Sequence, residues 1–400
     1  MKKTVLISLL LLVITINTQA QCGSRYVDTI FTSVTKTLNK KYGNNITIAG
    51  ANKDLFVDIY EPTGDTFEIR PLIILAHGGS FIGGSRTSPD VVELCNNFAK
   101  RGYVTASISY RLYDGLLFPL PDSLDMYDEA IKAVTDYKAA IRYFYKDRSS
   151  VNLYKIDTTQ IFIGGVSAGA ITAVNVAYID NVSETAPWIQ SIIASNGGLN
   201  GTSGNSGYSS KIKAIISVCG AVGNDSWIDA NDEPIISFHG TADDVVPFGY
   251  GCATIAGICI ANLDGSSKVH ARAASLGITN FLRIHYGQGH VPFATNPIYM
   301  DTTITDIVNF IAPMTLCNPT YIGESSYNLS FDYAPNPASG MIYINLEELK
   351  MVQLLDITGS ILLQKNENNI DVSRFSEGFY MVLVEDKNGK KGIKKLVIKH

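Results

Sequence analysis

Between about residue 50 and residue 315, short apolar runs alternate with longer stretches of helical periodicity. Apolar runs bounded by turn residues are typical of strands buried on both faces of a sheet. The predicted strands are Leu55–Tyr60, Leu72–Ala76, Val104–Ile108, Ile161–Gly164, Ile212–Val218, Ile235–Phe238 and Phe281–His285. The predicted helices are Asp90–Arg101, Asp122–Lys146 with Ser123 as its N-cap, Ala170–Ala177 and Thr303–Ile311. This alternation predicts an α/β fold: a mostly parallel sheet with helices on both faces.

The pattern changes after Pro319. Residues 321–400 contain short apolar runs separated by turn residues, without a long helical repeat. Tyr333–Pro337 is expected to be an irregular extended segment. The predicted strands are Met341–Leu346, Val352–Ile357, Ile361–Leu363, Phe379–Glu385 and Lys395–Lys399. We therefore expect a small C-terminal all-β sandwich of antiparallel strands.

The N-terminus has the features of a secretory signal peptide. Two lysines precede the apolar run Val5–Ile16, and Thr18–Ala20 supplies a cleavage site of small residues. The apolar run is shorter than the roughly 20 residues that a membrane-spanning helix needs. A lipid-anchored reading at Cys22 is less favoured, because Gln21 is not the small residue that such a site usually has. We predict that residues 1–20 direct export and are removed.

Export makes the cysteines informative, because an oxidising compartment permits disulfides. The chain has 6 cysteines, all after the predicted cleavage site. Cys252 and Cys259 bracket a short loop of Gly, Ala and Ile, and we expect them to be paired. Cys219 lies in an apolar run and is equally consistent with a buried free thiol. The sequence contains no Cys-x-x-Cys pair and no His-Glu-x-x-His run, so zinc binding has little support.

Composition narrows the possible functions. The chain is 46% hydrophobic and 17% charged, which excludes a disordered protein. Its net charge of −5 argues against a nucleic-acid partner held by a basic surface. After the N-terminal segment no apolar run is long enough to span a membrane. We expect two domains in the mature chain, residues 21–320 and residues 321–400.

The strongest chemical signal is the sequence Gly-Val-Ser-Ala-Gly around Ser167. It lies between a predicted strand and a predicted helix, where a tight turn lifts the serine hydroxyl clear of the sheet. The following helix offers free N–H groups, including that of Ala168, to a developing negative charge. Ser167 is therefore a candidate nucleophile.

A glycine-rich loop follows the predicted strand Leu72–Ala76. It begins His-Gly-Gly-Ser-Phe, so that Gly79 and Ser80 are the third and fourth residues after the strand. Backbone N–H groups in such a loop can turn toward a substrate carbonyl and form an oxyanion hole. We expect the donors to be Ala168 together with Gly79 or Ser80. The histidine of this loop, His77, is expected to be a structural hydrogen-bonding residue.

Two further loops supply a candidate acid and a candidate base. Asp243 follows the strand Ile235–Phe238 and precedes Val-Val-Pro, with Asp244 as its rival. His290 lies in a glycine-framed loop after the last predicted strand, and is the histidine best placed to reach the sheet edge. A carboxylate that accepts from histidine Nδ1 fixes its tautomer for proton transfer. The order Ser167, Asp243, His290 is that of α/β hydrolases.

Residues 50–315 resemble an α/β hydrolase of the carboxylesterase and lipase kind. The resemblance lies in the glycine-rich loop, in Ser-Tyr-Arg-Leu at residues 109–112, and in the three loops of the candidate site. Ser80 departs from the third glycine usual in lipases of the hormone-sensitive kind. That departure favours esterases of the feruloyl or acetyl type and leaves the second oxyanion donor open. The Asp-x-x-Val-Pro pattern also resembles peptidases of the prolyl-oligopeptidase kind.

The C-terminal region resembles another family. Ala-Pro-Asn-Pro at residues 334–337, Leu-Asp-Ile-Thr-Gly at 355–359, Gly-Phe-Tyr at 378–380 and Lys-Leu-Val-Ile at 395–398 are similar to the sorting domain of type IX secretion. The resemblance implies recognition by that secretion machinery, followed by release or attachment at the cell surface. A carbohydrate-binding sandwich is the alternative, although the region shows no clustered aromatic residues.

These observations predict a secreted serine ester hydrolase that forms an acyl-enzyme and needs no cofactor or metal. Its substrates would be feruloyl or acetyl esters on polysaccharides, or short-chain esters. The alternatives are a serine peptidase and a non-catalytic binding protein of the same fold. Leu116–Pro119 and Phe248–Tyr250 are possible pocket walls, more often plain packing or rim residues, and the polar stretch Ser195–Ser210 is expected to be a mobile loop.

Overall fold

The computed structural model describes residues 24–118, 121–294, 296–315, 329–356 and 361–400. The predicted signal peptide, Cys22 and Cys317 lie outside the described residues. The chain divides into two compact units, Met1–Pro319 and Thr320–His400. No helix in the described ranges is both long enough and apolar enough to cross a membrane.

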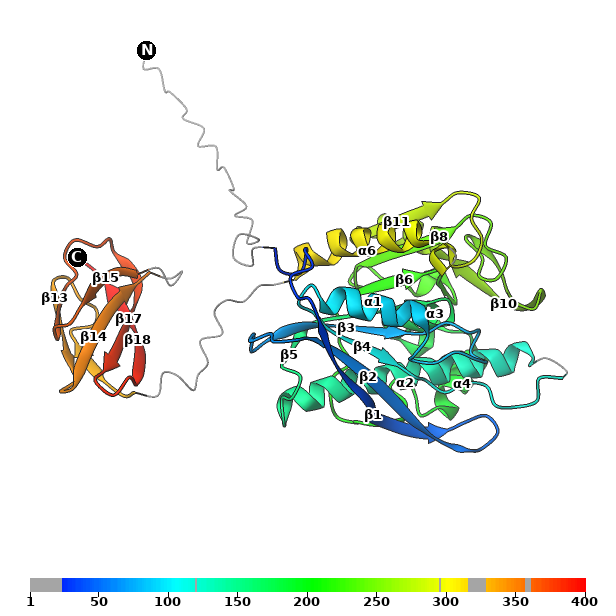
Figure 1. Ribbon diagram of the computed structural model, residues 1–400, viewed down its shortest axis with the longest axis horizontal. Coiled ribbons are helices and arrows are strands. Elements are labelled where there is room, and N and C mark those ends of the chain that lie inside the picture. The colour runs from blue at the N-terminus through cyan, green and yellow to red at the C-terminus, as the bar shows by residue number, and fades with distance from the viewer. Residues whose placement is uncertain (1–23, 119–120, 295, 316–328, 357–360) are drawn as a thin grey trace, which may run out of the picture. The chain divides into compact units, whose positions relative to one another are not determined.

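The first unit is built on an eight-stranded sheet in the order β1-β2-β4-β3-β5-β6-β8-β11 (Figure 1). The first pairings, β1 with β2 and β2 with β4, are antiparallel, and all the others are parallel. The strands are β1 Val34–Ile46, β2 Asn52–Pro62, β3 Arg70–Ala76, β4 Val104–Ile108, β5 Ile156–Val166, β6 Ala214–Val218, β8 Ile235–Gly240 and β11 Asn280–His285.

Helices cover both faces of this sheet. They are α1 Pro89–Ala99, α2 Ser123–Ser149, α3 Ala168–Tyr178, α4 Pro187–Ser195, α5 Ser266–Ser275 and α6 Pro297–Ile311, with the 3-10 turns η2 Val182–Glu184, η3 Asp225–Trp227, η4 Pro292–Ala294 and η5 Ala312–Met314. Alternate residues of β3 enter different cores. Leu72 and Ile74 pack with α2 and α3, whereas Ile73 and Leu75 pack with α1 and α6. The predicted α/β architecture is confirmed.

A second, small sheet lies outside this frame. It has the order β7-β10-β9, with β7 Ala221–Val222, β9 Tyr250–Ile255 and β10 Ile258–Gly265. β9 and β10 form an antiparallel hairpin, and Cys252 is bonded to Cys259 across it. The predicted disulfide is therefore present, while Cys219 is a buried free cysteine.

Two local expectations are wrong. Ser123 is not the N-cap of α2: the side chain of Asp122 caps the helix by accepting from the backbone N–H of Asp125. The stretch Ser195–Ser210 is tied into the fold rather than loose. Ser203 is fully buried, and its carbonyl accepts a hydrogen bond of 2.9 Å from the backbone N–H of Asn44.

The second unit consists of two antiparallel sheets around one apolar core. One sheet has the order β12-β13-β16, and the other has the order β15-β14-β17-β18. The strands are β12 Asp332–Ala334, β13 Met341–Asn345, β14 Leu349–Leu355, β15 Ile361–Lys365, β16 Asn369–Asp371, β17 Gly378–Asp386 and β18 Lys391–Ile398. The predicted all-β character is confirmed. β12 lies partly in the segment that was expected to be irregular.

Candidate active site

Ser167 lies on a sharp turn between β5 and α3. Its φ of 54° and ψ of −119° are strained for a residue with a side chain. The turn depends on the glycines on either side. A Cβ on Gly165 would lie 2.4 Å from the backbone of Gly169, and one on Gly169 would lie 2.2 Å from the Ala76 carbonyl oxygen. These close contacts leave room only for glycine.

The structure brings Ser167, His290 and Asp243 together from three loops. His290 Nε2 lies 2.8 Å from Ser167 Oγ, and His290 Nδ1 lies 2.7 Å from Asp243 Oδ2. The loops follow β5, β11 and β8, and parallel strands present these ends at one edge of the sheet. Each pair is within hydrogen-bonding distance, in the arrangement that proton transfer from serine to histidine requires.

The carboxylate of Asp243 is held by several donors. Its Oδ1 accepts hydrogen bonds of 2.9 Å from the backbone N–H groups of both Val245 and Val246. Its Oδ2 faces His290 and lies 3.3 Å from His239 Nε2. Burial alone would raise the pKa of the carboxyl, but the hydrogen bonds from His239 and His290 outweigh it and hold the pKa well below its usual range. Asp243 is therefore ionised at neutral pH.

Asp244, the rival acid, is exposed and does not fill this position. Its backbone carbonyl accepts a hydrogen bond from the Thr254 hydroxyl.

The predicted oxyanion loop passes beside Ser167. A Cβ on Gly78 would lie 3.2 Å from Ser167 Cβ, which measures how closely the loop approaches the serine. Ser80 and Ala168 line one pocket together with Ser167, whereas Gly79 does not line it. The Gly79 carbonyl instead accepts from the N–H groups of residues 82 and 83 as the loop turns. Of the two predicted donors on this loop, Ser80 is the one that lines the pocket beside Ser167.

Tyr110 supports this loop from below, a role that sequence reasoning did not assign. Its hydroxyl donates a hydrogen bond of 2.7 Å to the His77 carbonyl, and its ring stacks on the His77 ring at 4.5 Å. His77 itself is buried, and burial lowers its pKa, with Nδ1 lying 2.7 Å from the Gly78 carbonyl. The neutral ring is therefore a structural donor, as the sequence predicts.

Arg111, in the Tyr-Arg-Leu segment, has a structural role. Its guanidinium lies 2.8 Å from Asp136 Oδ1, and both side chains are almost completely buried. The Ser203 hydroxyl also bonds Asp136, which connects the loop 195–210 to this pair. The pair ties the segment after β4 to helix α2, next to the oxyanion loop.

His239 and Cys219 complete the surroundings. His239 is buried, with Nδ1 2.8 Å from the Ser266 hydroxyl and Nε2 3.0 Å from the Val246 carbonyl. Cys219 has a φ of 54°, and its sulfur accepts from the backbone N–H of Val291, the residue after His290. From the sequence, only the position of each residue directly after a predicted strand could have indicated that it lies near the site.

Cys219, Asp243 and His290 have ligand atoms within 4.8 Å of one another, and in the described parts of the chain they are the one group that meets this spacing for a metal ion. Burial raises the pKa of the Cys219 thiol, which keeps it protonated. Both nitrogens of His290 and both oxygens of Asp243 already take part in hydrogen bonds. This donor set therefore suits proton transfer better than metal binding.

The two rim segments considered from the sequence do not line the pocket beside Ser167. Leu116 and Phe118 are highly exposed, and so is Tyr250. Pro119 lies outside the described residues. The pocket is lined instead by α2, α3 and the β9–β10 hairpin.

Comparison with known proteins agrees with this geometry. Residues 57–226 match the BD-FAE family, a hydrolase domain. The matched segment contains the predicted oxyanion loop and Ser167. The fold of the first unit resembles Thermogutta terrifontis esterase 2 phosphoramylated by tabun, with 20% identity and a TM-score of 0.51 over 71% of this chain and 97% of that chain. The same esterase phosphorylated by paraoxon aligns with 20% identity and a TM-score of 0.50 over 71% of this chain and 96% of that chain. No curated protein sequence matches the chain.

The second unit matches a different family. Residues 333–399 match the secretion system C-terminal sorting domain. The chain is therefore exported by type IX secretion to the cell surface or beyond, as the sequence predicts.

Proposed function

We propose that the protein is an ester hydrolase, a serine carboxylesterase that acts through Ser167, His290 and Asp243. The observation that carries this proposal is the continuous hydrogen-bonded chain from Asp243 through His290 to the Ser167 hydroxyl. We further propose that residues 1–20 are its signal peptide, residues 21–320 its catalytic domain and residues 321–400 its sorting domain.

In the first step His290 Nε2 takes the proton of Ser167 while the serine oxygen attacks the ester carbonyl. Negative charge then develops on the carbonyl oxygen. The backbone N–H groups of Ala168 and Ser80, with Gly79 as the alternative on the loop, are oriented before the charge appears. One such donor is worth about 3–4 kcal/mol in the transition state, so the glycine-rich loop contributes to the rate as directly as the nucleophile does.

Asp243 stabilises the imidazolium that forms on His290 and keeps Nδ1 protonated between the steps. His290 next gives its proton to the departing alcohol, which leaves an acyl group on Ser167. Water then enters and His290 activates it for the second step. The His290 side chain is 20% exposed, so the side on which the alcohol leaves and water arrives is open to solvent. A bulky alcohol, such as a polysaccharide, can be accommodated on this side.

Labelling with a fluorophosphonate probe, combined with hydrolysis of p-nitrophenyl acetate, tests the proposal. We expect the wild type to be labelled and active, and Ser167→Ala to be neither. Ser191→Ala, an exposed serine on α4, is the matched control and should behave like the wild type. A folded wild-type protein that is not labelled would leave the binding-protein alternative. Peptide cleavage in preference to ester cleavage would favour a serine peptidase.

A further inference from the structure

An apolar pocket of about 70 Å³ opens beside Ser167. Its walls come from α2, from α3, from the loop after Asp243 and from the β9–β10 hairpin. The side chains that shape it include Met126, Ala130, Ile171, Val246, Ile255 and Leu263. A site with these walls binds hydrocarbon rather than sugar hydroxyls.

The position of the catalytic groups shows which half of the ester enters this pocket. The departing alcohol oxygen must reach His290 Nε2 to receive its proton. The pocket is lined by Ser167, Ala168 and Ser80, the nucleophile and the proposed oxyanion donors, but His290 does not line it. The group that fills the pocket is therefore the acyl chain, and the alcohol lies on the solvent side.

A second apolar cavity, of about 40 Å³, lies behind the first. Four residues line both cavities: Tyr127, Ala130, Ile171 and Leu263. They stand between the two spaces as a partition. Beyond the partition the second cavity is lined by residues such as Val134, Ile189 and Trp227.

We propose that this partition, and above all Ile171 and Leu263, limits the ester hydrolase to short aliphatic acyl groups. The proposal rests on the assignment of Ser167 as nucleophile. An engineered apolar cavity of about 150 Å³ binds benzene, so a pocket of about half that volume suits a short acyl chain better than a feruloyl ring. Acetyl and other short acyl esters are then the substrates, and longer chains are blocked by the partition.

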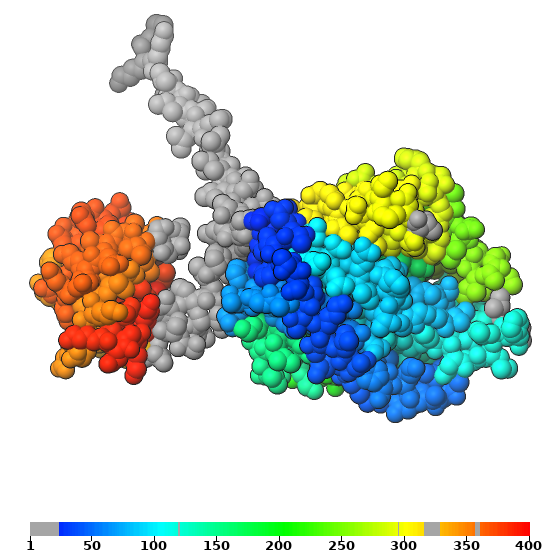
Figure 2. Space-filling view, in the orientation of Figure 1, coloured from blue at the N-terminus to red at the C-terminus, as the bar shows by residue number. Residues whose placement is uncertain are grey.

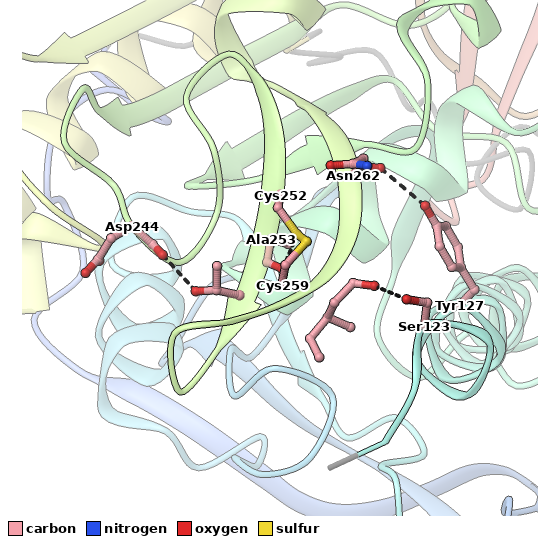
Figure 3. Close-up of a disulfide and its surroundings, with 9 residues drawn as sticks. Ser123, Tyr127, Asp244, Cys252, Ala253, Cys259 and Asn262 are labelled. Atoms are coloured by element: carbon pink, nitrogen blue, oxygen red, sulfur yellow. Dashed lines mark hydrogen bonds between the residues drawn. A yellow bond between two sulfur atoms is a disulfide. The ribbon is translucent and has the colours of Figure 1, made fainter. Parts of the chain in front are cut away.

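The hairpin that carries Leu263 is attached on two sides, at Asp244 and at the start of α2 (Figure 3). On one side, the hydroxyl of Thr254 bonds the Asp244 carbonyl at 2.7 Å, and its N–H bonds the Val245 carbonyl at 2.8 Å. On the other side, the Tyr127 hydroxyl donates to the Asn262 carbonyl at 3.2 Å.

The start of α2 and the Cys252–Cys259 disulfide complete this attachment. Ser123 donates to the Ile260 carbonyl, and the hairpin, yellow-green in the space-filling view, reaches the surface of the first unit (Figure 2). The disulfide closes the hairpin itself. The wall carrying Leu263 is therefore fixed relative to both the acid loop and α2, so it does not yield to a longer chain.

The test compares kcat/KM for p-nitrophenyl acetate, butyrate, hexanoate and octanoate. In the wild type we expect kcat/KM to fall at least tenfold between butyrate and octanoate. Ile171→Ala and Leu263→Ala join the two cavities, and each should raise the octanoate-to-acetate ratio about tenfold, because every additional buried methylene is worth several-fold. Leu276→Ala is the matched control, since this partly buried leucine packs against the same core but lines neither cavity.

Two results would overturn the partition. One is a wild type that hydrolyses octanoate as efficiently as acetate, and the other is variants whose octanoate-to-acetate ratio does not change. If both alanine variants fail to fold, Ile171→Val and Leu263→Val carry the same comparison, with a smaller expected increase in the ratio. Failure of the proposed function looks different: the wild type would then hydrolyse none of the esters, and a fluorophosphonate would not label Ser167.

Discussion

Asp243→Asn is the sharpest test of the proposed mechanism, because the surrounding structure dictates how the new amide is oriented. Two backbone N–H groups, those of Val245 and Val246, point at Oδ1 from 2.9 Å. They require an acceptor there, so the amide oxygen takes this position. The NH₂ group is then directed at His290 Nδ1 and at His239 Nε2.

This orientation predicts the size of the defect. An NH₂ group facing His290 Nδ1 favours the tautomer with the proton on Nε2, which can no longer accept the proton of Ser167. The imidazolium also loses its facing carboxylate. The same replacement in a serine protease triad lowers kcat by about 10⁴, so we expect a loss of about 5–6 kcal/mol of transition-state stabilisation here. KM should change little, because Asp243 does not line the acyl pocket.

The measurement is kcat for p-nitrophenyl acetate, with urea unfolding to show that the variant is folded. Asp244→Asn is the matched control: it makes the same chemical change on the neighbouring, exposed residue and should retain wild-type kcat. A loss of activity in Asp244→Asn with activity kept in Asp243→Asn would refute the assignment of the acid. Equal, modest losses in both would show that neither carboxylate orients His290.

Three further changes test the supporting structure. Tyr110→Phe leaves the buried His77 carbonyl without its 2.7 Å donor, so urea unfolding should show a loss of about 1–3 kcal/mol and kcat should fall more than KM rises. Burial raises the pKa of Glu129 from 4.5 to about 7. The folded state therefore holds this proton more tightly than the unfolded state, and the resulting stabilisation is complete below pH 4.5 and is lost as the pH rises through 7. Between pH 4.5 and pH 8 the free energy of unfolding of Glu129→Gln, measured in urea, should gain about 3 kcal/mol relative to that of the wild type. Replacing both Cys252 and Cys259 by serine opens a loop with a sequence separation of 7, which should lower the free energy of unfolding by about 2.4 kcal/mol and weaken the preference for short acyl chains. Wild-type protein that unfolds at the same urea concentration in reducing and in oxidising buffer would contradict this.

The frame of the first unit could be predicted because its strands are buried on both faces. The runs around Ile73, Ile163 and Ile215 are almost entirely apolar, and the strand predicted from each run lies within a few residues of the observed strand. β1 was not predicted. It is an edge strand, largely exposed, and its lysines and asparagines give no alternation that could be recognised.

The hairpin β9–β10 was also missed, and with it the wall of the acyl pocket. Its residues are mostly half-buried or exposed, so the apolar pattern is weak over Tyr250–Gly265. The cysteines predicted a local bridge, but pairing alone does not say what the bridged segment contacts. Two of the contacts that place Leu263, Tyr127 with Asn262 and Ser123 with Ile260, join residues more than a hundred positions apart. No local pattern carries that information.

Chemistry and specificity therefore reside in different parts of the first unit. The oxyanion loop, Ser167, Asp243 and His290 follow β3, β5, β8 and β11, and a parallel sheet brings these ends to one edge whatever the loops contain. One wall of the proposed acyl pocket comes instead from a hairpin outside that sheet, attached by hydrogen bonds and a disulfide. Changes in the sheet-edge loops should lower kcat for all esters by the same factor. Changes in the hairpin should alter the ratio between esters while the serine remains reactive toward a fluorophosphonate.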